Sequence, residues 1–413
     1  MQPKKQNLHY AWLILIACCM MQGAGLGLIS NCAGVFFSPV CNDLGFEMGK
    51  FTLFKTLSTL SQAVALPYVA KFFKQKDVRV IVSVATIIMA GTSILQGMSD
   101  SLWQFYILGM IQGCSSAFVG MIPAPILLGN WFYKNTGTAI GISAAFSGLV
   151  GMIGSSTLGF MIPAYGWRTS YIIMGIVVMV LILPFSMFVL RYKPEDKGLL
   201  PYGADETYAA NANGKGAAKR EKISDFLQQP IFYIATAAYA FTIIGAYLNS
   251  FLPSCGLEAG LPLATAALLT SLALAGNMTS KLFLGKLCDS FGVIKVFVVS
   301  ILIAVTGHLL VYTGATAAMM GGALLYGITM PLSTVMMPMF CRLFWKGDTY
   351  ASAYSYVSMI GMLISAPFNS IFGSMYDKTG SYDMTILFSA ACVAAVLVLV
   401  ILPGMLHKKE KNA

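Results

Sequence analysis

Charge is scarce in this 413-residue chain, where Asp, Glu, Lys and Arg together make up 10% and hydrophobic residues 57%. Soluble globular domains carry about 25% charged residues, so the composition argues against an ordinary soluble domain. Apolar runs long enough to cross the ~30 Å hydrocarbon core of a bilayer recur along the chain. The ~10-residue alternating segments of a membrane barrel are missing. The predicted fold class is therefore all-α, a polytopic membrane protein.

Histidine is also scarce, with three in the chain, and the nine cysteines include no CxxC pair. We therefore expect no metal and no cofactor, and we interpret the cysteines as small core residues. No nucleophile, base and orienting acid converge in the apolar runs, which makes a membrane enzyme the weakest alternative. The net charge of +10 is spread over short loops instead of one patch, so no nucleic-acid binding is predicted.

Twelve transmembrane helices are predicted, six in each half of the chain. A polar segment, 191–230, separates an N-terminal half (1–190) from a C-terminal half (231–413), and its Gly/Ala/Asn-rich stretch is typical of a flexible cytoplasmic linker. The predicted helices cover residues 10–37, 48–72, 78–98, 102–129, 138–164, 169–190, 231–252, 263–287, 293–313, 317–343, 351–375 and 384–406.

The two halves resemble each other at an offset of 214 residues. The residues that coincide at this offset are Gly113 with Gly327, Trp131 with Trp345, Gly159 with Gly373, and Gly166 with Gly380. Six plus six helices built as a repeat are the plan of secondary transporters that rock around a site between their halves, near the middle of the membrane.

Basic residues set the predicted orientation. With the N-terminus in the cytoplasm, most of the 26 Lys and Arg fall in cytoplasmic segments, and the outside loops hold only Lys50, Arg168 and Lys378. An excess of Lys and Arg in cytoplasmic loops is the usual bias of membrane proteins. We therefore expect a monomeric, multi-pass protein of the inner (plasma) membrane with both ends in the cytoplasm.

Lys281 lies inside the apolar run of the eighth predicted helix. An ammonium group at that depth costs about 3 kcal/mol and normally faces a partner, a cavity or a substrate. No Asp or Glu lies in any predicted helix to pair with it, so we predict an anionic substrate as the partner. The alternative is that the side chain reaches back to the cytoplasmic interface. Lys55, one turn into the second helix, is predicted to extend to the outer interface instead.

Amide and phenol side chains within the helices are further candidates. Asn277 shares a helix face with Lys281, because the two are four residues apart. Asn31 and Asn249 lie on the first helix of each half, and for every buried amide the alternative is a hydrogen bond between helices. His308 is interpreted as a packed or interfacial histidine, with proton coupling as the alternative. The predicted substrate-binding residues are Lys281, Asn277, Asn31, Asn249, Gln112, Tyr247 and Tyr356.

The turn after the eighth helix, Gly285-Lys-Leu-Cys-Asp289-Ser-Phe-Gly292, resembles the cytoplasmic signature of the major facilitator superfamily. A glycine there permits close helix approach, and the Asp can cap a neighbouring helix or pair with a basic loop residue. Gly285, Asp289 and Gly292 are therefore predicted to form a cytoplasmic gating motif. The equivalent turn in the first half has Phe73 in place of the Asp. The resemblance implies the major facilitator fold and alternating access.

Two further motifs, Asn130-Trp-Phe-Tyr-Lys and Gly166-Trp-Arg, resemble the monocarboxylate-porter and oxalate–formate antiporter branch. This resemblance implies a basic substrate contact in the eighth helix, here Lys281. The Asp that precedes it in proton-coupled members is Asn277 in this chain. A second basic residue, expected in the eleventh helix of oxalate-type antiporters, is missing.

These observations predict a secondary transporter of a small organic anion. One lysine suits a monocarboxylate better than a dianion. With no carboxylate in any predicted helix, exchange or facilitated movement is favoured over proton symport. Two alternatives stay open. One is a carrier of drug-like, amphiphilic or sugar substrates, in which some of the 25 methionines line an adaptable pocket. The other is a transporter-like sensor that does not transport.

Overall fold

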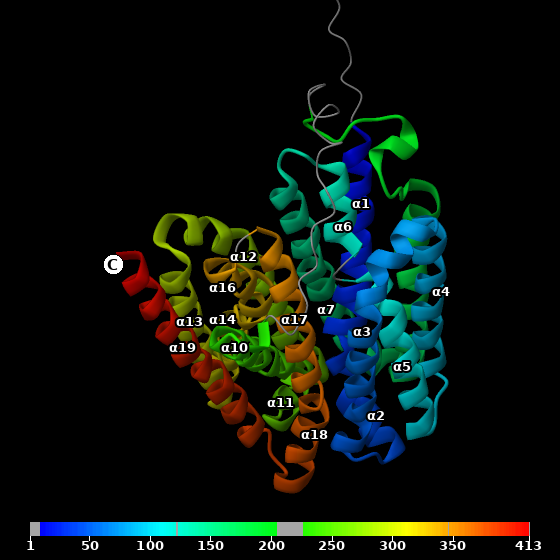
Figure 1. Ribbon diagram of the computed structural model, residues 1–413. Helices are drawn as coiled ribbons and strands as arrows, with labels where there is room; N and C mark the ends of the chain where they lie inside the picture. The colour runs from blue at the N-terminus through cyan, green and yellow to red at the C-terminus, as the bar shows by residue number, and fades with distance from the viewer. Residues whose placement is uncertain (1–8, 121–122, 205–225, 346, 413) are drawn as a thin grey trace, which may run out of the picture.

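The computed structural model describes residues 9–120, 123–204, 226–345 and 347–412, and the regular elements in these ranges are helices (Figure 1). The one exception there is a parallel backbone bridge between Phe132 and Tyr202. Ten helical segments of the described chain are long and apolar enough to cross a membrane. The predicted all-α, polytopic membrane fold is therefore confirmed.

The difference between ten segments and twelve predicted helices has two causes. The segment Thr136–Val189 contains two crossings, because the chain turns within it at Gly166, where φ is 81° and ψ is 159°. The other cause is α3 (Met48–Gln75), which at 28 residues is long enough to cross but too polar to count by composition. Three of its polar residues, Thr52, Lys55 and Thr56, contact other parts of the bundle.

The helices form two groups that lie side by side in Figure 1. The first helix group consists of α1 (Tyr10–Met21), η1 (Gln22–Asn31), η2 (Ala33–Phe36), α2 (Phe37–Leu44), α3, α4 (Val78–Gln96), α5 (Leu102–Val119), α6 (Pro123–Trp131), α7 (Thr136–Pro184), η3 (Phe185–Val189) and η4 (Pro194–Lys197). The second helix group consists of α10 (Pro230–Tyr247), η5 (Leu248–Ser250), α11 (Leu252–Glu258), α12 (Leu263–Phe291), α13 (Val293–Tyr312), α14 (Thr316–Tyr326), α15 (Thr329–Pro331), η6 (Leu332–Met336), α16 (Met337–Phe344), α17 (Gly347–Ser365), α18 (Phe368–Thr379) and α19 (Asp383–Asn412).

The two ends of the bundle can be told apart in Figure 1. We call the end with the start of α1, η4 and the end of α12 the linker side, because the segment between the groups begins there. The end with α2 and the turn between α18 and α19 is the opposite side. These names describe the molecule alone and assign no compartment.

Close helix approach between the groups depends on two glycines that the repeat pairs with each other. A Cβ added at Gly159 on α7 would lie 2.6 Å from the Cβ of Ala267 on α12. One added at Gly373 on α18 would lie 2.8 Å from the backbone of Met48 on α3. Small residues let helices pack closely where lipid supplies no hydrophobic drive for association. The offset of 214 thus relates the two main contacts between the groups.

The two branch motifs have structural partners within the first group. The indole of Trp131 donates to the Arg191 carbonyl at 2.9 Å, and Asn130 donates to the Tyr192 carbonyl at 3.0 Å. On the opposite side, Trp167 donates to Asp43 at 2.9 Å, and Arg168 forms an ion pair with Asp100. These residues hold loops in place and do not face the second group.

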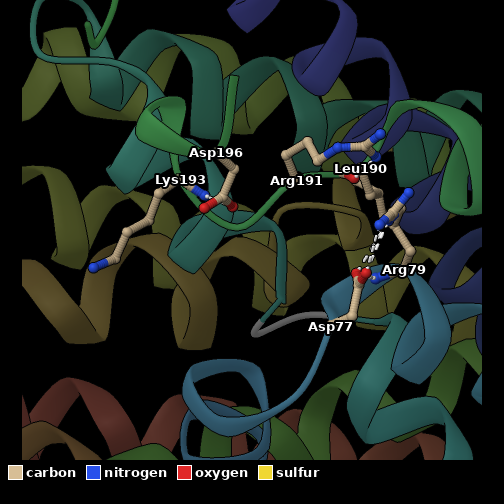
Figure 2. Close-up of polar contacts among 6 residues, drawn as sticks. All are labelled: Asp77, Arg79, Leu190, Arg191, Lys193 and Asp196. Carbon is tan, nitrogen blue, oxygen red and sulfur yellow. Dashed lines mark hydrogen bonds and ion pairs between the residues drawn. The ribbon is translucent and has the colours of Figure 1, made fainter. Parts of the chain in front are cut away.

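Asp77 caps the linker-side start of α4. Its Oδ1 accepts a hydrogen bond from the backbone N–H of Arg79 at 2.9 Å, and its carboxylate forms a 2.6 Å ion pair with the Arg79 guanidinium (Figure 2). Hydrogen bonds from the Arg79 side chain, together with its backbone N–H bond and its charge, hold the pKa of Asp77 below its ordinary value. Beside this pair in Figure 2, Asp196 accepts a 3.1 Å hydrogen bond from the backbone N–H of Lys193.

We expect Asp77→Ala to destabilise the protein by about 1 kcal/mol at neutral pH, the usual cost of losing an N-cap. Because the folded-state pKa is depressed, the carboxylate's contribution is present above the ordinary pKa. It is lost as the pH falls through the folded-state value. Apparent melting temperatures of detergent-solubilised wild type and variant, compared from pH 7 to pH 3, check this. Asp77→Asn, which keeps an acceptor, should lose less. A wild-type advantage that does not change with pH would contradict the electrostatic explanation.

Candidate functional site

The first helix of each group departs from regular α geometry where the groups meet. The α1 helix continues as the π-helical η1, and α10 continues as the 3-10 segment η5. Asn249 in η5 donates its Nδ2 hydrogen to the backbone carbonyl of Asn31 at 3.2 Å, so the two irregular segments face each other. π-helical turns are frequent at functional sites, and interrupted helices form the substrate sites of many carriers. This meeting point is therefore the candidate site.

Lys55 on α3 lies beside this meeting point. Its ammonium approaches the Ser30 carbonyl in η1 at 3.4 Å, and it interacts electrostatically with the thiol of Cys32. The side chain is half-buried and forms no ion pair with any described carboxylate. The expectation that Lys55 extends to the outer interface is therefore wrong, because its amine points toward η1 inside the bundle.

Amide and hydroxyl groups of the second helix group complete this region. The hydroxyl of Tyr247 lies 3.3 Å from the Ser365 Oγ and also faces Thr59 and Asn369. The Oδ1 atoms of Asn249 and Asn369 are buried and accept no hydrogen bond from the described residues. We call Asn31, Lys55, Tyr247, Asn249 and Asn369 the central cluster. Three of its members, Asn31, Asn249 and Tyr247, are predicted substrate-binding residues that the structure brings together.

Lys281 and Asn277 lie on α12, as predicted. Lys281 is half-buried and has no hydrogen bond or ion pair with a described residue. Asn277 is 2% exposed, and its Oδ1 accepts no hydrogen bond from the described chain. The backbone of Asn277 packs against Gly327, the residue directly after α14, so this part of α12 is held by its own group. The pair therefore offers one cation and one free amide oxygen on adjacent turns.

The two lysines lie at different depths. Gly27 of η1, Gly151 of α7 and Leu274 of α12 meet at one level between the groups. Lys281 is two turns beyond Leu274 toward the linker side, about 10 Å at the usual helical rise. Ser30, the contact of Lys55, is one turn beyond Gly27 in the other direction, about 4 Å. The backbone of Lys281 therefore lies about 15 Å along the bundle from the level of Ser30.

The close contacts between α7 and α12 end toward the linker side. Gly148, Gly151 and Gly159 on α7 meet α12 closely, whereas a Cβ added at Gly137 or Gly141 would meet nothing within 4 Å. The same is true of Gly285 on the facing stretch of α12. The two helices thus part beyond Gly148, on the side of Leu274 where Lys281 lies.

The opposite side is closed by hydrogen bonds across the groups. Asp377 on α18 accepts from the backbone N–H groups of Met48 and Gly49 at 2.8 and 2.6 Å, and so caps α3 of the other group. Ser38 and Ser254 lie 2.7 Å apart next to a cavity of about 240 Å³ that is lined in part by Asp377 and Cys41. Together these contacts define the opposite-side closure.

The other predicted site residues lie elsewhere. Gln112 donates to Ser93 at 3.1 Å between α4 and α5, inside the first group. The ring centroids of Tyr356 and Phe226 lie 5.9 Å apart, in an aromatic cluster separate from the central cluster. Asp289 is exposed and forms no hydrogen bond or ion pair with a described residue, and Gly292 has a φ of 85°. Both ring nitrogens of buried His308 are occupied, by the Ala304 carbonyl and by Ser389, which fits its interpretation as a packed histidine.

Sequence reasoning missed the direction of Lys55 and the capping role of Asp377. A signal for the first was available, since Gly23, Gly25 and Gly27 interrupt the first helix and favour the irregular geometry that exposes the Ser30 carbonyl. No local signal distinguishes Asp377, because its partners are backbone N–H groups more than 300 positions away in the chain.

An all-helical membrane bundle that is closed at one end and open at the other around a polar centre defines a membrane transporter. The chain belongs to the Major Facilitator Superfamily, which it matches over residues 13–366. The superfamily resemblance predicted from the turn motif is thus confirmed, while the monocarboxylate-porter and oxalate–formate branch stays a prediction.

Known proteins similar to this chain fall into several transport classes. It is 23% identical over 305 residues to the multidrug resistance protein MdtG of Klebsiella pneumoniae (strain 342), covering 73% of this chain and 70% of that one. It is 25% identical over 235 residues to the benzoate transport protein of Acinetobacter baylyi, covering 52% and 50%.

Among solved structures, a bacterial homolog of the human lysosomal transporter Spinster, in an inward-facing and occupied conformation, gives a TM-score of 0.71 at 16% identity and covers 98% of each chain. The nucleoside transporter NupG gives 0.70 at 12% identity, covering 95% of this chain and 98% of that one. These two likenesses concern the fold alone.

We expect Asp377→Ala to loosen the opposite-side closure, because Met48 and Gly49 then lose a charged acceptor. Hydrogen bonds to charged groups contribute about 1.5–3 kcal/mol, so opening should become at least about tenfold more frequent. The rate at which a membrane-impermeant maleimide modifies Cys41, as the sole cysteine of an otherwise cysteine-free protein, reports this opening. Asp383→Ala removes an exposed acid on the same side and serves as the control. Equal labelling rates in both variants would refute the capping role.

Proposed function

We propose that this transporter moves a small organic anion, most simply a monocarboxylate, between the two sides of the membrane by alternating access. The observation that supports this most directly is Lys281, an ammonium group within the helix bundle that has no ion pair among the described residues. A cation in that position is stabilised when an anionic solute enters the space beside it. Asn277, one turn away on α12, can orient the same solute by donating an N–H of its side-chain amide to a carboxylate oxygen.

The similarity to a benzoate transport protein adds independent support for a carboxylate with an apolar body. The carboxylate would lie near Lys281, and the body would contact the apolar side chains of α7 and α12. Such a division into one charged contact and apolar walls is typical of small-molecule sites.

For orientation and organisation, we propose that the linker side faces the cytoplasm of an inner (plasma) membrane. The basic residues Lys71, Lys74, Lys76 and Arg79 lie at that side, and few lie at the other. We further propose that the N-terminal half (1–190) and the C-terminal half (231–413) move as units about the central cluster. The residues 205–225 of the proposed linker lie outside the described ranges.

In this mechanism an anion enters from the cytoplasm and neutralises Lys281, after which the groups close behind it and the opposite side opens. The unpaired charge disfavours closing around an empty site, and this favours exchange or facilitated movement over net proton-driven uptake. Gly285, Asp289 and Gly292 are the proposed gating motif at the cytoplasmic end, where the glycines leave room for the helices to approach.

A second candidate function is export of drug-like or amphiphilic compounds. It is favoured by the similarity to multidrug resistance proteins over 73% of this chain. Under that function Lys281 would not contact the substrate, and neutral or cationic amphiphiles would compete with labelled substrate.

We expect Lys281→Met to raise the half-saturating concentration for carboxylate counterflow by at least about thirtyfold, because losing a desolvated charge contact costs about 2 kcal/mol or more. Proteoliposomes loaded with benzoate, acetate, lactate, oxalate or a neutral amphiphile, with and without a pH gradient, give the measurement.

Lys286→Met on the same helix removes an exposed charge and should behave as wild type. Lys281→Arg should retain much of the affinity. Wild-type counterflow with the neutral amphiphile and with none of the acids would reject the anion proposal in favour of the second candidate.

A further inference from the structure

We infer that Lys55 is a second anion-binding residue of this protein, located deeper than Lys281 and next to the opposite-side closure. The inference rests on the proposed anion transport and extends it from one cationic position to two positions that the anion occupies in succession. Lys281 receives the anion on entry, and Lys55 receives it before the opposite side opens.

The hydrogen bonding of Lys55 leaves its ammonium incompletely satisfied. A lysine ammonium has three donors, and the described chain offers it one acceptor, the Ser30 carbonyl, at a long 3.4 Å. The neighbouring Cys32 supplies no countercharge, because its thiol lies against the carbonyls of Gly27 and Gly151, each at 3.3 Å. Keeping a lysine at this depth without an acid is costly, and this fits a role in binding a charged solute.

The surroundings of Lys55 can orient a carboxylate. On the side of the second helix group, the Tyr247 hydroxyl and the amides of Asn249 and Asn369 supply hydrogen-bonding groups. Asn249 and Asn369 are 4% and 1% exposed, and each donates from its Nδ2 to a backbone carbonyl at 3.2 Å. A carboxylate only accepts hydrogen bonds, so the groups that can donate to it are these Nδ2 atoms and the Tyr247 hydroxyl, and not the amide oxygens. These polar groups belong to the second helix group, whereas Lys55 belongs to the first. A solute held by both sides would therefore bridge the groups.

The distance between the lysines separates their roles. The backbone of Lys281 lies about 15 Å along the bundle from the level of Ser30, which the Lys55 ammonium contacts, counted at the helical rise from the shared level of Gly27 and Leu274. A monoanion that enters from the linker side therefore passes Lys281 before it reaches Lys55. Removing either lysine should consequently affect a different step of transport.

Lys55 is also placed to link anion binding to the opposite-side closure. The next residue, Thr56, donates a 3.1 Å hydrogen bond to the Ala366 carbonyl of the second group. One turn earlier on α3, the Thr52 hydroxyl lies against Gly373. An anion that arrives at Lys55 thus binds beside Thr52 and Thr56, the residues of α3 that contact the second group.

The test measures benzoate counterflow in proteoliposomes for wild type, Lys55→Met, Lys55→Arg and Lys281→Met, with Lys50→Met as the control on the same helix, where the exposed lysine pairs with Glu47. We expect Lys55→Met to lower the maximal rate at least about tenfold with little change in the half-saturating concentration. The variant loses hydrogen bonds to the anion only when the anion lies at Lys55, after it has bound at Lys281. Lys281→Met should mainly change the half-saturating concentration. Lys55→Arg should recover most of the rate, and Lys50→Met should match wild type.

The melting temperature in detergent separates binding from a structural role. Lys55→Met should melt no lower than wild type, because the variant removes a poorly satisfied cation. A normal maximal rate in Lys55→Met would overturn the inference. A change confined to the half-saturating concentration and equal to that of Lys281→Met would overturn it too, since both lysines would then hold one bound anion. Absence of counterflow for every acid in the wild type would instead refute the proposed function itself.

Discussion

Close approach of helix backbones from the two groups is the constraint on which the rest of this structure depends. Inside a bilayer, helices gain little by hiding apolar surface from lipid, so their association relies on packing and polar contacts. The lack of a side chain at Gly159 and Gly373 allows that packing, because a Cβ at either position would collide with the other group. Toward the linker side these contacts end, since a Cβ added at Gly141 or Gly137 would have no neighbour within 4 Å.

The charged residues of the bundle fall into two sets, acids at the opposite side and lysines farther inside. Two acids at the opposite side accept hydrogen bonds from backbone N–H groups: Asp377 from the start of α3, and Glu258 from Tyr382 at 2.9 Å. These acids are thus engaged in closing and shaping one end. Lys55 on α3 and Lys281 on α12 form no ion pair with a described acid, so the bundle has uncompensated positive charge along its interior. That imbalance is the physical basis for expecting an anionic solute.

Much of the fold could be predicted from the sequence because hydropathy and length fix the number and approximate limits of helices. The repeat could be predicted too, and its glycine and tryptophan pairs have matching roles: Trp131 donates to a backbone carbonyl at 2.9 Å, and Trp345 donates to Gln229 at 2.8 Å. Only part of the candidate site could be predicted. Periodicity identifies a buried polar residue but not its neighbour. The structure is needed to show that Gln112 bonds to Ser93 within the first group and that Lys55 is directed at η1.

The repeat also explains why the cations lie at two depths. The helices α3 and α12 correspond at the offset of 214, and each carries one lysine in its interior. The positions are not equivalent, however, because Lys55 corresponds to Leu269 and Lys281 corresponds to Pro67. Lysines at equivalent positions would lie at the same level on the two sides of the interface and repel each other across it. Staggering them avoids that repulsion. In the proposed mechanism it also gives an anion successive positions along the path, at points where the two halves depart from their common plan.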